Sequence, residues 1–300
     1  MGRPYHIISF DGGGVLGLYS ATLLSRLTAL FPEMLEKADL LTGTSTGGLI
    51  ALTLAHGLTP TQIMDIYLLR SKEIFARQLC YSMATLWGLA GSKYHNAGLV
   101  KVCNDTFGDQ ILGRLPKKVL IPAFDLMSEG SPANPSWRAR FFHNLAPDDY
   151  SELVSDVAIR TASAPTYFPT YQGYCDGGVF ANSPGTLAIA QAVEKLGVDL
   201  ADIRLLSIGT GGQIKYIDGQ QLDWGLLKWV RPVVNIFMES QSLVTEATCK
   251  KFLGDRYFRL NPICPEIEMD DVSRMPDLIR AANETDLTPA IRWMRDKFLA

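Results

Sequence analysis

Several features that would mark common classes of protein are scarce or missing in this chain of 300 residues. The five cysteines lack the CxxC spacing of a zinc site, which favours reduced thiols over a disulfide framework. No apolar run approaches the roughly 20 residues of a membrane-spanning helix, and the N-terminal apolar run is too short for a signal peptide. We therefore expect a cytoplasmic protein that at most touches a membrane surface.

An excess of charge of one sign is also missing. The 28 Lys and Arg residues nearly balance the 31 Asp and Glu residues, so the formal net charge is −3. A nearly neutral chain lacks the attraction on which binding to nucleic acids and to anionic membranes depends. We therefore expect no nucleic-acid partner. The composition, with 47% hydrophobic residues, is that of a globular protein with a substantial core.

Short apolar runs alternate with segments of helical periodicity over the first two thirds of the chain. The expected strands are 5–10, 38–43, 117–125 and 203–212. The expected helices are 18–31, 46–57, 60–77 and 184–197. This alternation predicts an α/β fold with a central, mostly parallel sheet flanked by helices.

The pattern becomes helical from about residue 215, over 222–254 and again over the last 25 residues or so. No linker separates this part from the rest. We predict an α/β core over 1–215 and a helical C-terminal extension over 216–300, packed on the same domain. Trp224 and Trp229 of the extension are interpreted either as core residues or as part of an interfacial face that meets lipid.

The stretch LLTGTSTGGLIAL (40–52) places Ser45 between Gly43 and Gly47, where an apolar strand turns into a helix. Such a turn can lift a serine hydroxyl off a sheet, and the N-terminus of the following helix favours a developing anion. By itself, however, the pattern is explained equally well by a structural Gly/Ser turn.

A nucleophilic serine needs a proton acceptor, which is usually histidine. The chain has only four histidines, and none adjoins a glycine-rich turn: His6, His56, His95 and His143. A partly desolvated carboxylate can act instead. The stretch YCDGGVFANSP (174–184) offers Asp176, followed by Gly177 and Gly178, although an ordinary Asp-Gly turn explains this stretch as well.

The stretch DGGGVLG (11–17) satisfies G-x-G-x-x-G through Gly12, Gly14 and Gly17. One interpretation is a dinucleotide-binding turn, which also needs an acidic residue at the end of a second strand. Glu33 and Glu36 are near the required spacing but stand at a helix end, which disfavours an oxidoreductase. The other interpretation is an oxyanion hole built from glycine N–H groups.

Together, DGGG with Gly17, GTSTGG and DGGVFANSP resemble the patatin-like phospholipase family. ASAPTYFP (162–169) extends the resemblance, which covers roughly residues 5–215. It implies a Ser-Asp dyad with Ser45 as the nucleophile and Asp176 as the proton acceptor. It also implies hydrolysis of lipid or phospholipid esters at a membrane or micelle surface, with neither a metal nor a nucleotide cofactor.

The resemblance also assigns the oxyanion hole to the backbone N–H groups of Gly12, Gly13 and Gly14. The chain departs from the family at Leu16, where members often carry Arg or Lys, so the headgroup preference stays open. Tyr167 and Phe168 are interpreted either as contacts for an acyl chain or as core residues. A soluble-ester esterase or thioesterase with the same dyad and a non-catalytic lipid-binding or storage protein are the alternative functions.

Overall fold

The computed structural model describes residues 2–76, 91–127, 135–213, 217–219 and 222–300. Its centre is a sheet of seven described strands in the order β4-β3-β2-β1-β6-β7, with β5 paired to β3 as well. The strands are β1 (Tyr5–Phe10), β2 (Leu40–Gly43), β3 (Lys118–Asp125), β4 (Arg138–His143), β5 (Tyr174–Asp176), β6 (Ile203–Ile208) and β7 (Tyr257–Leu260). The pairs from β3 through β2, β1 and β6 to β7 are parallel. Strands β4 and β5 pair antiparallel with β3.

Helices connect most of these strands. The longer ones are α1 (Gly17–Leu30), α3 (Thr46–His56), α4 (Pro60–Ile74), α6 (Ala97–Phe107), α7 (Val154–Ala162), α9 (Gly185–Leu196), α10 (Leu226–Leu253) and α11 (Met275–Glu284). The shorter ones are α2 (Met34–Lys37), α8 (Gly178–Ala181), α12 (Thr288–Trp293), the 3-10 helices η1 (Gly14–Leu16), η3 (Leu112–Arg114), η4 (Pro147–Asp149), η5 (Gly254–Arg256) and η6 (Val272–Arg274), and the π-helix η7 (Met294–Phe298).

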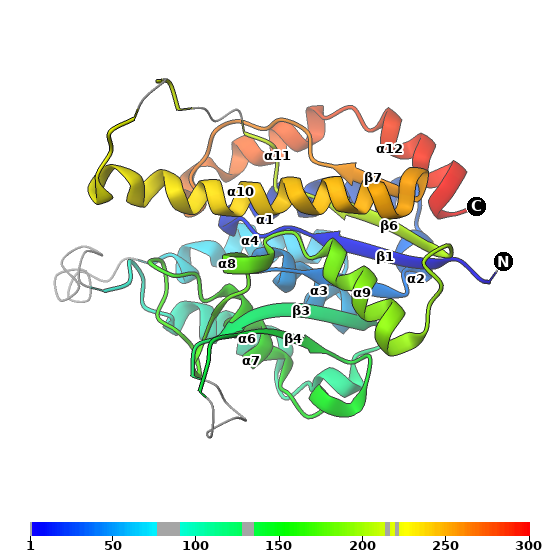
Figure 1. Cartoon of the computed structure of the whole chain (residues 1–300), viewed down its shortest axis with the longest axis horizontal. Coiled ribbons are helices and arrows are strands. Elements are labelled where there is room, and N and C mark those ends of the chain that lie inside the picture. Colours follow the sequence, from blue (N-terminus) through cyan, green and yellow to red (C-terminus); the bar gives the residue numbers. More distant parts are fainter. Residues whose placement is uncertain (1, 77–90, 128–134, 214–216, 220–221) are drawn as a thin grey trace.

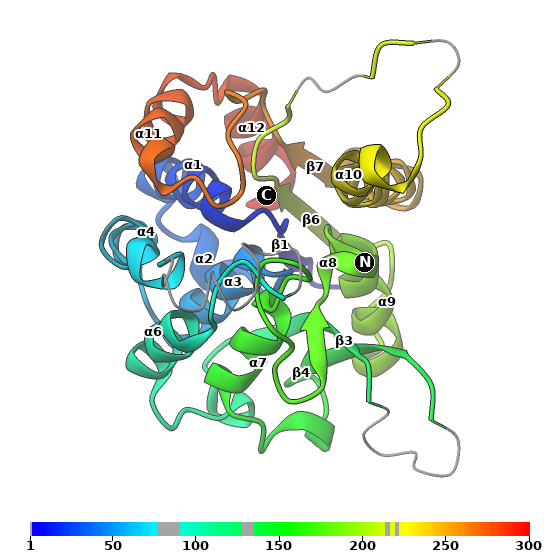
Figure 2. The ribbon, with the colours of Figure 1, turned by 90° about the vertical axis from the view of Figure 1, so that its left-hand side faces the viewer.

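The sheet is buried on both faces, and successive side chains of a strand point to opposite faces. On β1, Ile8 and Phe10 belong to the larger core, which includes side chains of α1 and α3. Ile7 belongs to a second core together with Ala188 of α9 and Cys249 of α10. Figure 2 shows α1, α4 and α6 on one side of the strands and α9 and α10 on the other. The molecule is therefore the expected α/β structure with a mostly parallel sheet.

Several helix ends follow signals that are visible in the sequence. Helix α4 starts with Pro60 and is capped by Thr59, whose side chain and backbone exchange hydrogen bonds with Gln62. Helix α3 ends at Gly57 and α9 at Gly197, each with a positive φ, of 107° and 65°. Glycine adopts this conformation at low cost, so both ends lie where the sequence predicts them.

The C-terminal part differs from the expectation in one element. It is largely helical, through α10, α11 and α12, but it also contributes β7, which extends the sheet beside β6. Figure 1 shows α10, α11 and β7 packed along the same side of the molecule. The division at residue 215 stays a prediction. Among the described residues, no helix is both long and apolar enough to cross a membrane.

Candidate active site

The register of the sheet brings Ser45 and Asp176 together. Strand β2 pairs with the first part of β3, up to Thr42 opposite Leu120. Strand β5 pairs with the last part of β3 in the opposite direction, with Asp176 opposite Ala123. The C-terminal ends of β2 and β5 therefore point toward each other beside β3. Ser45 follows one end and Asp176 forms the other, so two distant stretches of the chain meet.

Ser45 occupies the turn between β2 and α3 with a backbone φ of 55° and ψ of −124°. A non-glycine residue reaches this conformation only at a cost, which surrounding contacts must offset. A Cβ at Gly43 would lie 2.1 Å from the Gly47 carbonyl oxygen, and a Cβ at Gly47 would lie 2.3 Å from that of Phe10. Gly43 is therefore required by the close approach of the start of α3, and Gly47 by the packing of the turn against β1.

Two successive hydrogen bonds link the Ser45 backbone to α7 and through it to β3. The Ser45 N–H donates to the hydroxyl of Thr161 at 3.0 Å, and that hydroxyl donates to the Pro122 carbonyl at 2.6 Å. Thr161 lies at the end of α7, and Pro122 lies in β3 between the residues paired with β2 and β5. Thr161 is not among the residues predicted from the sequence, although it stands immediately before the family-like ASAPTYFP stretch.

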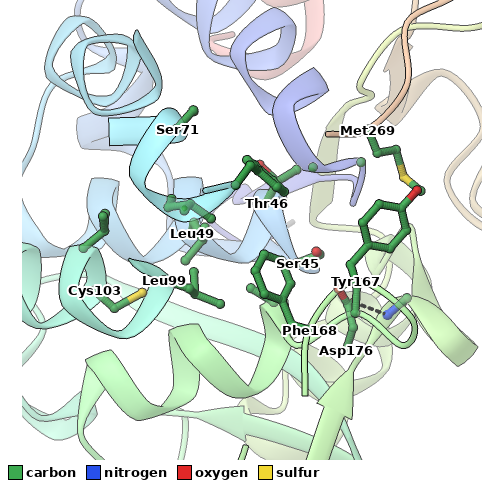
Figure 3. Close-up of a pocket in the computed structure, with 18 of the residues that line it drawn as sticks. Ser45, Thr46, Leu49, Ser71, Leu99, Cys103, Tyr167, Phe168, Asp176 and Met269 are labelled. Carbon is green, nitrogen blue, oxygen red and sulfur yellow. Dashed lines mark hydrogen bonds between the residues drawn. The ribbon is translucent and has the colours of Figure 1, made fainter. Parts of the chain in front are cut away.

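Asp176 is buried, with 5% of its surface exposed. Burial raises the pKa of its carboxyl from 3.8 to about 6, while hydrogen bonding with the Ser45 side chain and the Gly178 N–H works in the opposite direction. The Gly178 N–H donates to Oδ1 at 2.7 Å, as Figure 3 shows. Gly177 permits the close approach to β3, since a Cβ there would lie 2.5 Å from the Pro122 carbonyl oxygen. A carboxylate with this pKa is ionised at neutral pH and is a stronger base than an exposed one.

The glycine loop after β1 lies against Ser45, but its N–H groups are not equivalent. The Gly12 N–H donates to the Asn182 carbonyl at 3.0 Å, so it is already used. The assignment of Gly12 as an oxyanion donor stays a prediction, which this hydrogen bond disfavours. Gly13 and Gly14 both line the cavity beside Ser45, and their N–H groups have no partner within the described part of the chain.

A further N–H is available at the start of α3. The Thr46 N–H has no partner among the described residues, and Thr46 lines the cavity beside Ser45. It belongs to the first residue of a helix, where the positive end of the helix dipole favours an anion. Gly17 leaves room for this residue, because a Cβ at Gly17 would lie 2.2 Å from the Thr46 hydroxyl oxygen.

The conformation of the glycine loop is held from the C-terminal part of the chain. Gly14 has a φ of 59°, and a Cβ there would lie 2.1 Å from the Met269 carbonyl oxygen, which accepts the Val15 N–H at 2.8 Å. Asp11 forms a buried ion pair with Arg259 of β7, through Nη1 to Oδ1 at 2.9 Å and a second bond from Nη2. Burial by itself lowers the pKa of the Arg259 guanidinium. The charge of the Asp11 carboxylate and its hydrogen bonds are the main effects in the opposite direction, and the pKa is raised overall. No pattern in the sequence had pointed to Arg259.

The DGGVFANSP segment is likewise held by α10. The Asn182 N–H donates to the Gln241 side chain at 3.0 Å, and the Gln241 amide donates to the Val179 carbonyl at 3.3 Å. Thr245 Oγ1 donates to the Ser183 carbonyl at 3.2 Å. Since Asn182 in turn binds the Gly12 N–H, contacts run without a break from α10 to the glycine loop.

A cavity of about 270 Å³ opens at Ser45 and Asp176 and extends between α3, α4, α6 and α7. Figure 3 shows Ser45, Asp176 and Tyr167 at one end of it and Leu99, Cys103 and Ser71 farther away. Its apolar lining includes Leu49, Ile66, Phe75, Leu99, Val102 and Phe107.

The polar groups in the cavity wall are largely satisfied by their own helices. The hydroxyls of Thr53 and Thr106 donate to backbone carbonyls one turn earlier, those of Leu49 and Val102. Burial raises the pKa of the Cys103 thiol to about 12, so this cysteine is uncharged. Tyr167 and Phe168 both line the cavity, as the acyl-contact interpretation requires. The interior therefore suits an apolar ligand.

The histidines lie elsewhere in the molecule. All four histidines are within the described residues, and none of them lines this cavity. The described part of the chain holds no group of three or more His, Cys, Asp or Glu side chains placed to bind a metal ion. Leu16, at the position where the family often has a basic residue, is buried.

Comparisons with known proteins show which family the chain belongs to. Residues 8–189 match the family described as "Patatin-like phospholipase". Protein teg of Priestia megaterium is 32% identical and spans 97% of this chain and 98% of its own length. A cGAMP-activated phospholipase of Pseudomonas aeruginosa is 30% identical and spans 94% of this chain and 85% of its own.

Among solved structures, VipD from Legionella pneumophila aligns with 94% of this chain and 67% of its own, at 11% identity and a TM-score of 0.42. The family match covers more than half of the chain, and the relatives named above match it almost from end to end. The chain belongs to the patatin-like phospholipase family.

Proposed function

We propose that this protein is a lipid acyl hydrolase in which Ser45 attacks a carboxylic ester and Asp176 accepts the serine proton. The observation that carries the proposal is the convergence of the serine hydroxyl, a buried carboxylate and unused N–H groups at one end of an apolar cavity. Family membership supports a phospholipid or another lipid ester as the substrate, and one relative is named a phospholipase.

In the first half of the reaction, Ser45 Oγ bonds to the ester carbonyl carbon while its proton passes to the Asp176 carboxylate. The carbonyl oxygen becomes an oxyanion and accepts hydrogen bonds from the N–H groups of Gly13, Gly14 and Thr46. When the C–O bond breaks, Asp176 returns its proton to the departing alcohol. The product of this half-reaction is an acyl ester of Ser45.

In the second half, a water molecule attacks the acyl-enzyme carbonyl and gives its proton to Asp176. The oxyanion forms again at the same N–H groups. The tetrahedral intermediate then expels Ser45 Oγ, which takes the proton back from Asp176, and the fatty acid leaves. One carboxylate therefore acts as base and acid in turn, which suits a pKa near 6 better than the usual 3.8.

Because the cavity is apolar, we propose that the part of the substrate bound deepest is an apolar acyl chain and not a polar acyl group. Leu49, Phe75, Leu99 and Phe107 line its walls. Each buried CH₂ contributes about 0.8 kcal/mol, so longer chains should bind more tightly until the cavity is filled. A soluble-ester esterase with a small acyl group would show no such dependence.

The experiment that tests the proposal is covalent labelling with a fluorophosphonate, mapped by mass spectrometry, alongside hydrolysis of p-nitrophenyl esters from acetate to palmitate. We expect wild type to label at Ser45, and Ser45→Ala and Asp176→Asn to lose turnover by at least about 1,000-fold. The rate for wild type should rise with pH around an apparent pKa of about 6, because Asp176 acts in its ionised form.

Labelling elsewhere, or full activity in either variant, would contradict the Ser45–Asp176 dyad. If wild type bound fatty acids but neither labelled nor hydrolysed any ester, with or without detergent micelles, a lipid-binding protein would replace the hydrolase. A preference for acetate over longer chains would replace the lipid hydrolase with a soluble-ester esterase.

A further inference from the structure

Over residues 236–245, helix α10 presents four apolar side chains to solvent, beside the exposed Glu239 and Ser240, and polar side chains to the protein. Nearer its C-terminal end, Cys249 and Leu253 face the core in the usual way. Ile236, Phe237, Leu243 and Val244 are 42%, 59%, 58% and 66% exposed. The buried or half-buried positions include Gln241, Ser242 and Thr245. A surface helix of a globular protein normally has the reverse arrangement, with its apolar stripe facing the core.

The inward polar face has a clear role in the fold. Gln241 and Thr245 hold the backbone of residues 179–183 through the hydrogen bonds to Val179, Asn182 and Ser183. Ser242 adds a contact from the Asn182 amide at 3.5 Å. The outward apolar face has no corresponding partner among the described residues. Figure 2 shows α10 at the outside of the molecule, with no described helix or strand beyond it.

The outward residues form a single stripe. Ile236 and Leu243 are seven residues apart, as are Phe237 and Val244, and this spacing places all four on one side of an α-helix. Single exposed apolar residues are common on protein surfaces and need no explanation. Four exposed apolar residues on one side of a single helix are different, because clustered exposed apolar surface is typical of an interaction site.

The stripe continues into the mouth of the cavity. Phe237 belongs to the stripe and also lines the cavity, together with the adjacent Met238 and with Val179, which is itself 42% exposed. A lipid that left an apolar phase at the stripe would therefore reach Ser45 along apolar side chains. This continuity favours a lipid surface over a protein as the occupant.

We infer that the stripe of Ile236, Phe237, Leu243 and Val244 docks on the surface of a lipid bilayer and so opens the cavity mouth directly to the acyl chains. This inference rests on the proposed function, since it concerns the delivery of a lipid ester to the same cavity.

Two tryptophans lie at the N-terminal end of α10. Trp224 and Trp229 pack edge to face with ring centroids 5.4 Å apart. Both are half-exposed and outside the hydrophobic cores, as suits aromatic side chains at a membrane interface.

The inference is tested by flotation with phosphatidylcholine vesicles, using the full chain carrying Ser45→Ala so that binding is measured without hydrolysis. Leu243→Asp is compared with Leu30→Asp, because Leu243 and Leu30 are 58% and 54% exposed but Leu30 lies at the end of α1. We expect Leu243→Asp to weaken vesicle binding at least about tenfold and Leu30→Asp to leave it unchanged. Thermal unfolding checks that each variant is folded, and Val244→Ser replaces Leu243→Asp if the latter is not.

Absence of vesicle binding by the Ser45→Ala protein, or equal losses in the two Leu→Asp variants, would overturn the docking inference. So would a dimer in sedimentation equilibrium that Leu243→Asp dissociates, because the stripe would then be an interface between two copies. Vesicle binding without ester hydrolysis by wild type would leave docking intact and contradict only the proposed function.

Discussion

Burial of Asp176 lowers the stability of the folded protein at neutral pH. The folded state holds the carboxyl proton with a pKa of about 6, against the usual 3.8, so it binds this proton more tightly than the unfolded chain does. Ionisation therefore penalises the folded state progressively as the pH rises from about 4 to about 6, and the penalty is complete above that range. A difference of about two pKa units corresponds to about 3 kcal/mol at most.

We therefore predict that Asp176→Asn, which removes the buried charge and keeps an acceptor for the Gly178 N–H, stabilises the protein. Its free energy of unfolding should exceed that of wild type by about 1 to 3 kcal/mol at pH 7.5. The gain should shrink as the pH falls through 6 toward 4, where the wild-type carboxyl is protonated in the folded state. Urea unfolding at pH 7.5 and 5.0 measures both values, and a gain that is the same at both would contradict a penalty from the buried charge.

The buried ion pair of Asp11 and Arg259 is expected to affect stability mainly when one of its two charges is removed. Removing one partner leaves a buried charge without its counterion, which typically costs about 3 to 5 kcal/mol, whereas removing both charges costs less. We predict that Arg259→Met destabilises the protein by about this amount and that adding Asp11→Asn recovers at least half of the loss. Urea unfolding of the two single variants and the double variant measures the coupling, and additive losses would contradict it.

At the scale of secondary-structure elements, the position of β5 could not be predicted from the sequence alone. YCDGGVFANSP points to Asp176 through its resemblance to the family, because an Asp-Gly turn alone explains the stretch as well. Its strand has only three residues, too few to show a period, and its antiparallel pairing with the far end of β3 is a tertiary contact. The same limit applies to β7, whose four residues pack beside β6 within a segment of helical character.

Helices with capping residues and clear periodicity were predictable because their signals lie within the helix itself. Thr59, Pro60 and Gly57 act locally, so the limits of α3 and the start of α4 can be inferred without knowledge of the fold. The motif residues were predicted because their three stretches together resemble the family, whereas Thr161, Gln241 and Arg259 support the site from distant parts of the chain. Threonine, glutamine and arginine are common in such positions for many reasons, so no sequence signal singled them out.

Helix α10 is predicted to influence the reaction through Gln241, whose side chain bonds both Asn182 and Val179. Gln241→Ala removes both bonds and loosens the segment that holds the Gly12 N–H. We expect kcat to fall about tenfold with little change in KM, since a small displacement at the site affects the transition state more than substrate binding. Gln191→Ala on α9 is the control, because the Gln191 side chain bonds only to the nearby Glu194 in the described structure. Equal kinetics for the two variants would rule out this influence.

At the scale of the whole molecule, the near balance of charge bears on how the protein would meet a membrane. With a net charge of −3, the chain as a whole is not attracted to anionic lipid, so we expect the apolar stripe of α10 to supply most of the binding. We predict that binding to vesicles of phosphatidylcholine and anionic phosphatidylserine changes less than about threefold between 50 and 500 mM NaCl, because apolar burial is not screened by salt. Flotation at the two salt concentrations measures this, and a loss of tenfold or more would indicate electrostatic docking instead.

The backbone of Ser45 has a consequence for how the family can change over evolutionary time. Its φ of 55° is tolerated by a serine at a cost and by glycine at almost none. Asp176 carries a similar cost in its buried charge. A descendant that no longer needed catalysis would therefore gain stability by drifting to glycine at position 45 and asparagine at position 176. If the proposed function holds, the presence of both costly residues in one chain is what selection for the reaction would maintain.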